Sequence, residues 1–222
     1  MIRAVLLDLD GTLADTAPDL GFALDVQRNS RGLAAIPIEA LRRYVSQGAR
    51  GMLYVGFGLT PEQARYVELR DEFLDLYARN ICRDTRLFPG IPDLLDALDA
   101  RELAWGVVTN KAERFTLPLL EALGLRKRAD CIVGGDTCAR AKPHPDPLLE
   151  AARRLGVDAD ACLYLGDDER DVQASGAAGM AAVVAMYGYL GDGSHPAQWQ
   201  AHAYMGHPAE LLRLLTPAPP MG

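Results

Sequence analysis

The chain has 222 residues, of which 49% are hydrophobic, and its formal net charge is −7 at pH 7. This apolar content is enough for a real core and excludes a largely disordered chain. The negative charge argues against nucleic acid, whose phosphates attract basic surfaces. It does not exclude a small anionic substrate, because a metal or a lysine can reverse the sign locally.

No stretch of the sequence predicts export or membrane insertion. The first apolar run is interrupted at Asp8, and residues 176–190 are too short and too rich in glycine for a membrane span. The four cysteines, at positions 82, 131, 138 and 162, form no C-x-x-C pair and have no zinc-ligand spacing. They predict reduced thiols in a cytoplasmic protein.

The first predicted element is a buried strand that ends in two acids. Residues 5–16 read "VLLDLDGTLADT", so Asp8 and Asp10 stand one residue apart and are followed by Gly-Thr. Side chains at i and i+2 of a strand face the same way. The chain therefore brings two like charges together at the end of a core strand.

The next segment, residues 15–85, contains no apolar run of strand type and is expected to be helical. Helical patterns occupy 18–26 and 38–45. A further helix is predicted to begin with Thr60 as its N-cap and Pro61 in its first position. This segment reads as an all-α insert.

From residue 87 onward, short apolar runs alternate with helical patterns. Strands are predicted at 103–110, 129–136, 161–168 and 180–186, and helices at 91–98, 114–124, 147–156, 171–179 and 207–215. Such alternation predicts a parallel sheet covered by helices on both faces. We expect an α/β fold: a Rossmann-like core of residues 1–14 and 86–222, with residues 15–85 as an inserted cap. The tail, 216–222, is expected to fray.

Polar side chains follow four of the predicted strands. In order along the chain they are Asp8 and Asp10, Thr109 and Asn110, Lys142, and then Asp167, Asp168 and Asp171. Ligands of open parallel sheets bind beyond the carboxyl ends of the strands. We therefore expect five acids, a lysine and a hydroxyl to meet at one edge of the sheet.

This set of groups predicts a magnesium site. Asp8 and Asp10 would repel each other unless a cation lay between them, and hard oxygen ligands suit Mg²⁺. Asp167 could supply a third oxygen from the neighbouring strand. The alternative, that Asp8 and Asp10 only cap a turn before glycine, accounts for one aspartate and leaves the other acids unexplained.

The same groups can carry out phosphoryl transfer. An ionised Asp8 can attack phosphorus, while Lys142 supplies a positive charge and Thr109 a hydroxyl for the phosphate oxygens. Asp10 can protonate the leaving oxygen and later activate water. Together they describe a phosphoryl-transfer site that works through an aspartyl-phosphate.

Four segments resemble the ordered motifs of the haloacid dehalogenase superfamily of phosphatases. They are "DLDGT" at 8–12, "VVTN" at 107–110, "AKPHPDP" at 141–147 and "GDDERD" at 166–171. The resemblance covers nearly the whole chain. It implies a core with a helical cap inserted after the first motif, and it implies Asp8 as nucleophile with Asp10 as acid and base.

The resemblance also implies the ligands of the phosphate and of the metal. Thr109, Asn110 and Lys142 would bind phosphate. Mg²⁺ would be held by Asp8, the main-chain carbonyl of Asp10, and Asp167. Two further acids, Asp171 and more distantly Asp168, would support those ligands.

Within the superfamily, "DTAPDL", "LFPGI" and "GVVTNK" resemble the phosphoglycolate phosphatase branch. "SQGARGM" and "YGY" are similar to relatives that act on N-acetylmuramic acid 6-phosphate. Because the core motifs contact only the phosphoryl group, the cap is expected to select the substrate. Its candidate contacts are Ser46, Gly48 and Arg50, and Arg50 suits the carboxylate that both substrates carry.

The expected function is a Mg²⁺-dependent phosphomonoesterase for a small carboxylate-bearing phosphate ester. A sugar phosphomutase of the same fold stays open as an alternative. A non-enzymatic phospho-acceptor signalling domain is a second alternative, although it needs neither a helical cap nor Asp10. The expected partner is the small-molecule substrate, with no nucleic acid and no membrane, and the chain is expected to be a monomer or homodimer.

Overall fold

A parallel sheet forms the centre of the computed structural model, which describes residues 1–191 and 193–215. The predicted tail, 216–222, lies outside the described residues. The sheet has six strands in the order β5-β4-β1-β6-β7-β8, and every neighbouring pair is parallel. The strands are β1 (Ala4–Leu7), β4 (Ala104–Val108), β5 (Cys131–Val133), β6 (Cys162–Gly166), β7 (Ala181–Ala185) and β8 (Ala203–Met205).

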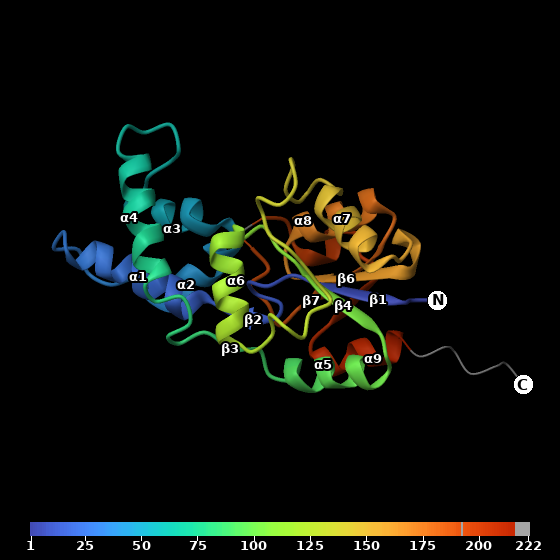
Figure 1. Ribbon diagram of the computed structural model, residues 1–222. Helices are drawn as coiled ribbons and strands as arrows, with labels where there is room; N and C mark the ends of the chain where they lie inside the picture. Colours follow the sequence, from blue (N-terminus) through green and yellow to red (C-terminus); the bar gives the residue numbers. More distant parts are fainter. Residues whose placement is uncertain (192, 216–222) are drawn as a thin grey trace, which may run out of the picture.

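Helices cover both faces of this sheet, which confirms the predicted α/β class (Figure 1). They are α5 (Ile91–Ala100), α6 (Glu113–Ala122), α7 (Asp146–Leu155), α8 (Glu169–Ala178) and α9 (Leu211–Leu214). Alternation along β1 divides the core: Val5 and Leu7 pack with α5 and α9, whereas Ala4 and Leu6 pack with α7 and α8. Strand β8 was not predicted, because three residues are too few to form a recognisable strand pattern.

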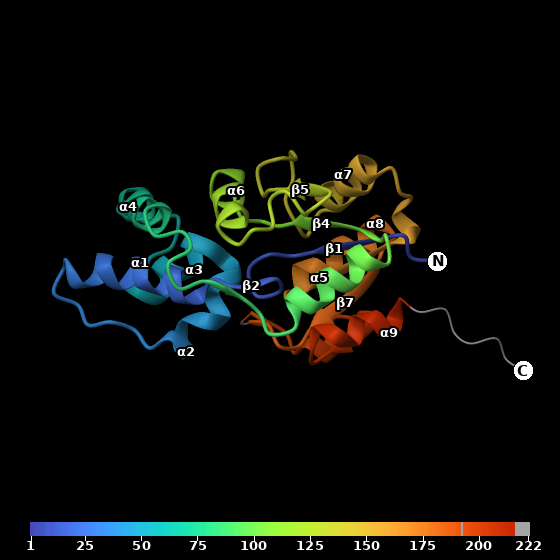
Figure 2. The same cartoon turned by 60° about the horizontal axis from the view of Figure 1, so that its bottom comes forward.

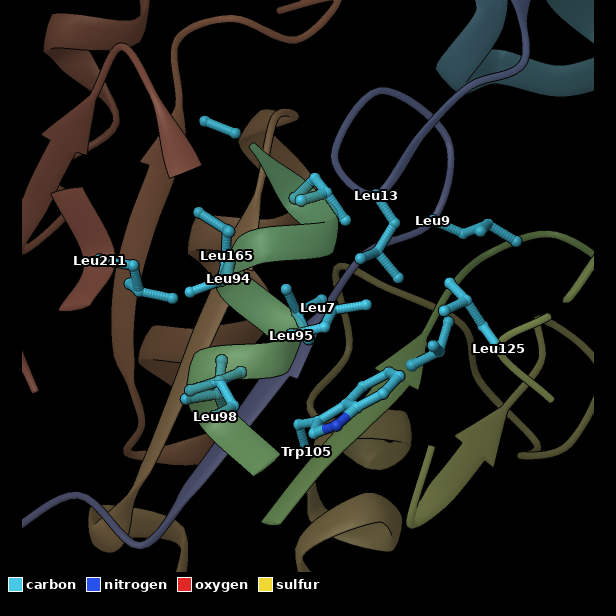
Figure 3. Packing of buried hydrophobic residues seen from close by; sticks show 14 of the residues in the cluster. Leu7, Leu9, Leu13, Leu94, Leu95, Leu98, Trp105, Leu125, Leu165 and Leu211 are labelled. Atoms are coloured by element: carbon cyan, nitrogen blue, oxygen red, sulfur yellow. The ribbon is translucent and has the colours of Figure 1, made fainter. Parts of the chain in front are cut away.

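The apolar cluster between the sheet and α5 is larger than the cluster on the opposite face of the sheet (Figure 3). Leu94, Leu95 and Leu98 of α5 lie at helical spacing and are at most 1% exposed. Trp105 is fully buried beside them, and its indole Nε1 donates to Asp99 Oδ1 over 2.8 Å. Truncating one of these leucines to alanine costs about 2–5 kcal/mol of stability. This packing fixes the strands whose ends carry the polar residues.

A helical group lies to one side of the sheet (Figure 2). It consists of α1 (Ala17–Asn29), α2 (Ile38–Leu41), a 3₁₀ segment η1 (Arg42–Gln47), α3 (Gly48–Phe57) and α4 (Tyr66–Ala78). These helices share an apolar cluster of their own, which includes Leu24, Met52 and Phe73. We call this group the cap; the boundaries 15 and 85 stay a prediction.

Helix α4 begins five residues after the predicted start. Thr60 was expected as its N-cap and Pro61 as its first residue, but the helix starts at Tyr66. The backbone N–H of Thr60 does donate to Gln63 Oε1, over 2.6 Å, within a turn. Residues 61–65 are all exposed, so nothing packs on them, and helices in proteins are stabilised mainly by packing.

A short antiparallel ribbon joins the sheet to the cap and was missed by the sequence patterns. It pairs β2 (Ala14–Asp15) with β3 (Arg86–Leu87), where the chain leaves the sheet and where it returns. Two-residue strands are too short to produce a periodic pattern. In the described part of the chain, no helix is both long and apolar enough to pass through a lipid bilayer.

Candidate active site

The turn after β1 is shaped by contacts with a buried carboxylate. Gly11 has φ +86°, and a Cβ there would lie 2.2 Å from Asp167 Oδ2, so only glycine fits. The Thr12 hydroxyl donates to Asp167 Oδ1 over 2.9 Å. The Asp8 carboxylate accepts the N–H of Leu9 over 2.8 Å. The Asp-x-Asp-Gly-Thr motif therefore forms the turn after β1 and also contacts Asp167, which follows β6.

Lys142 connects the end of β1 with β6 and with helix α8 at the sheet edge. Its Nζ lies 3.1 Å from Asp8 Oδ1 and donates to Asp171 Oδ1 over 2.7 Å. Nζ also donates to the hydroxyl of Tyr164 over 2.7 Å and to the carbonyl of Val108 over 3.2 Å. The ammonium group is thus fixed between two carboxylates, and its side chain is only 2% exposed.

Burial and crowding control the charges in this cluster. Burial raises the pKa of Asp8 to about 7, with Lys142 opposing the shift and Asp171 and Asp10 adding to it. Burial, together with the charges of Asp8 and Asp171, raises the pKa of Asp167 well above its ordinary range. Burial lowers the pKa of Lys142, but the two carboxylates outweigh it and the net shift is upward.

The carboxylates fit a divalent cation. Oxygen atoms of Asp8, Asp167 and Asp171 all lie within 4.8 Å of one another, and all three residues are buried. A bound cation would offset the repulsion that raises the pKa values, and an all-oxygen donor set suits Mg²⁺. Asp10 does not contribute its side chain to this group, which leaves its main-chain carbonyl as the predicted ligand.

The Asp10 carboxylate is instead held by a pair of donors. The Thr16 hydroxyl donates to its Oδ1 over 2.5 Å, and Lys111 Nζ over 2.9 Å. The Lys111 side chain is 9% exposed, and its Nζ lies over the ring of Tyr77, 4.8 Å from the centroid. The sequence reasoning did not single out Lys111, although it directly follows the Thr-Asn pair of the second motif.

Thr109 and Asn110 both line the cavity above Asp8, with different contacts. Thr109 is 2% exposed, and its Oγ1 accepts the N–H of Lys111 over 3.2 Å. The Asn110 side chain bonds both main-chain groups of Lys142: Nδ2 donates to the carbonyl over 2.9 Å, and Oδ1 accepts the N–H over 3.0 Å. Asn110 therefore positions the lysine loop.

Two acids organise the start of α8. Asp168 is the N-cap and accepts the N–H of Arg170, while Asp171 Oδ2 accepts the N–H of Asp168, which completes a capping box. Arg170 is paired with Asp168 over 2.7 Å, and this pairing outweighs burial and lowers the pKa of Asp168. Asp168 is thus engaged with an arginine, and it is not part of the three-carboxylate cluster.

The three predicted cap residues separate into two places. Ser46 and Gly48 line the cavity of about 280 Å³ above Asp8, whereas Arg50 is exposed and lines a larger neighbouring cavity. The hydroxyl of Ser46 is buried without a hydrogen-bond partner in the structure. The carbonyl of Ser46 accepts a hydrogen bond from Arg170 Nη2 over 2.7 Å, a contact between cap and core that no sequence pattern indicated.

The sequence of this chain is similar to a family of known proteins. Residues 5–185 match the model of the haloacid dehalogenase-like hydrolases. The chain is 41% identical over 214 residues to an N-acetylmuramic acid 6-phosphate phosphatase of Pseudomonas aeruginosa, covering 96% of this chain and 95% of that protein. It is 45% identical over 210 residues to a phosphoglycolate phosphatase of Xanthomonas campestris, covering 94% of each.

Solved structures agree with the sequence relatives. A predicted phosphoglycolate phosphatase from Haemophilus somnus superposes with a TM-score of 0.84 at 26% identity, covering 97% of this chain and 98% of that one. None of these three relatives is named a phosphomutase or a signalling domain. The chain belongs to the haloacid dehalogenase-like hydrolase family, and it is a hydrolase of phosphate monoesters.

Proposed function

We propose that this hydrolase is Mg²⁺-dependent and acts through an aspartyl-phosphate on Asp8. Its substrate would be a small carboxylate-bearing phosphate ester, either 2-phosphoglycolate or N-acetylmuramic acid 6-phosphate. The observation that carries the proposal is the position of Asp8: a buried carboxylate 3.1 Å from Lys142 and beside two further buried carboxylates, at a cavity that the cap also lines. The relatives' names support the substrate class.

The reaction would proceed in two displacements. In the first, an oxygen of Asp8 forms a bond to phosphorus, the bond to the leaving oxygen breaks, and Asp10 gives that oxygen a proton. In the second, Asp10 takes a proton from water, the water oxygen bonds to phosphorus, and Asp8 leaves as a carboxylate. Lys111 and Thr16 support this role of Asp10, because they fix its carboxylate beside Asp8.

Charge is the main difficulty for such a reaction, since a dianionic ester must approach several carboxylates. Asp8, Asp167 and the main-chain carbonyl of Asp10 would hold Mg²⁺, with Asp171 beside them. When bound, the ion would offset the negative charge of the phosphoryl group and the acids. Lys142 adds a fixed positive charge next to Asp8, and Asp171 and Asn110 hold it there.

Phosphate oxygens would be bound by Lys142 and Thr109, and the cap would contact the leaving group. Ser46 supports that part of the proposal, because an unpartnered buried hydroxyl costs about 1–3 kcal/mol unless a ligand satisfies it. The cap division at residues 15–85, a cytoplasmic location and a monomeric or homodimeric state complete the proposal. The four cysteines, which form no disulfide, are consistent with that location.

The test is release of inorganic phosphate from both candidate esters, measured with Mg²⁺ and after treatment with excess EDTA. We expect stoichiometric phosphate with the ion and loss of turnover without it. Full turnover in EDTA would contradict the metal requirement. Phosphate isomerised on the sugar without release of inorganic phosphate would instead favour a mutase.

A further inference from the structure

A second cavity adjoins the catalytic one, and Asp8, Thr109 and Lys142 are not among its lining residues. Its volume is about 770 Å³, against about 280 Å³ for the cavity above Asp8. Both cavities are lined by Gln47, Asp168 and Arg170, so the two spaces meet at these residues. If the phosphate binds at Asp8, a leaving group that extends past these three residues enters the second space.

The size of the second cavity separates the two candidate substrates. The glycolate portion of 2-phosphoglycolate is only a few atoms long and fits with its phosphate in the smaller cavity. Sites for larger organic ligands have volumes of roughly 300–1,000 Å³. A cavity of about 770 Å³ therefore has room for a substituted sugar ring, which phosphoglycolate would leave unfilled.

The walls of this cavity suit a sugar that carries apolar and polar groups. The cap contributes Tyr54 and Leu59, and the core contributes Leu190 and Trp199. The indole Nε1 of Trp199 donates to the carbonyl and hydroxyl of Ser194 over 3.1 and 2.9 Å, so the ring is held in place as a wall. Trp199 is only 6% exposed and supports the wall from behind, whereas Tyr54 is 52% exposed and offers an aromatic surface for the C–H groups of a sugar or an amide methyl.

The charges of the walls allow one additional anionic group, and disfavour several. Arg170 is already paired with Asp168, whereas Arg50 is an exposed cation on the cap side. Glu62 and Glu169 also line the cavity and would repel a second phosphate. A sugar with a single carboxylate could pair with Arg50 and would bring no second phosphate close to the two acids. N-acetylmuramic acid is such a sugar, because it has one carboxylate on its lactyl ether.

We propose that this second cavity is the leaving-group subsite for a sugar acid, and that the enzyme prefers N-acetylmuramic acid 6-phosphate to 2-phosphoglycolate. The inference rests on the proposed function, since it assumes that the phosphate is cleaved at Asp8. The volume of the second cavity and the residues that line it favour the sugar acid over the smaller ester.

The experiment fills the cavity and compares substrates. Gln173 lies on α8, is exposed and lines the second cavity, so Gln173→Trp introduces bulk without disturbing the core. Ala177 is exposed on the same helix and is not among the lining residues, which makes Ala177→Trp the matched control. The kcat/KM of each protein is measured with N-acetylmuramic acid 6-phosphate, 2-phosphoglycolate and p-nitrophenyl phosphate, in the presence of Mg²⁺.

The parent enzyme should favour the sugar acid ester over phosphoglycolate by tenfold or more in kcat/KM. Gln173→Trp should reduce that preference by about tenfold, equivalent to ~1.4 kcal/mol, and Ala177→Trp should leave it unchanged. A parent preference for phosphoglycolate, or an equal loss for both esters in Gln173→Trp, would overturn this inference alone. No phosphate release from any of the three esters would overturn the proposed function as well.

Discussion

Polar side chains at the sheet edge and on the cap differ in whether they already have partners in the protein. At the sheet edge, each ionised group has fixed partners: Lys142 contacts Asp8, Asp171 and Tyr164, and Asp167 accepts two hydrogen bonds. On the cap, Arg50 is exposed, and the hydroxyl of Ser46 has no hydrogen-bond partner among the described residues. Chemistry requires groups fixed before the substrate arrives, whereas recognition can leave groups for the substrate to satisfy. Substitutions at the two regions should therefore differ in size and in kind.

The strongest test of this contrast is Asp8→Asn at the sheet edge. Asparagine keeps an acceptor for the N–H of Leu9 but is no nucleophile, so turnover should fall by roughly 10⁵–10⁶-fold or to an undetectable level. The measurement is kcat with each ester, alongside circular dichroism to verify folding. Beryllofluoride should form an adduct with the parent and not with the variant. A folded Asp8→Asn protein with near-normal turnover would mean that water attacks phosphorus directly.

Asp10→Asn should have the next largest effect. The amide cannot donate the proton to the leaving oxygen, which costs about 10²–10⁴-fold in rate. The loss should be smaller for p-nitrophenyl phosphate, because its leaving group needs little protonation. Comparing kcat for the aryl ester with kcat for an alkyl ester checks this. Equal losses for the two esters would argue against Asp10 as the acid.

Metal binding should stabilise the sheet edge in a pH-dependent way. The folded-state pKa of Asp8 is raised from 3.8 to about 7, so without metal its stabilising contribution is lost as pH rises through that window. A cation binds the ionised carboxylates, so its affinity should increase over the same range. At about 100-fold excess over its Kd, Mg²⁺ would add about 2.7 kcal/mol of stability.

The measurement is the Mg²⁺-induced change in Tm by calorimetry. We expect an increase of roughly 5–10 °C at about pH 8 and a much smaller one at about pH 5.5. Asp167→Asn is the companion variant: it removes a buried charge whose pKa is raised by burial, so it should raise the Tm of the metal-free protein and abolish the Mg²⁺ response. An Mg²⁺ response that is identical at both pH values would contradict the assignment of the cluster.

The smallest expected effect belongs to the cap. Arg50→Ala should raise KM for N-acetylmuramic acid 6-phosphate by about tenfold, the scale of one charge-assisted contact, with little change in kcat. N-acetylglucosamine 6-phosphate, which lacks the carboxylate, is the control and should lose nothing. Equal weakening of both sugars would show that Arg50 does not contact the acid group.

The sequence by itself determined the α/β fold and the edge at which the polar residues gather. Apolar runs and helical patterns are local properties, and the parallel-sheet rule then brings Asp8, Thr109, Lys142 and Asp167 to one end of the strands without knowledge of any contact. The start of α4 was predicted wrongly, since the helix begins at Tyr66 and not at Pro61. The capping pattern at Thr60 is a local signal, and packing of the residues from Tyr66 onward outweighs it.

Tertiary structure alone decided which side chains meet. The Lys111–Asp10 pair joins residues 101 positions apart, and the contact from Arg170 to the carbonyl of Ser46 spans 124. It also placed Arg50 beside a second cavity and not above Asp8. Such contacts depend on how the cap rests on the sheet. No periodic pattern encodes that arrangement, because it is set by packing between segments that are distant in the chain.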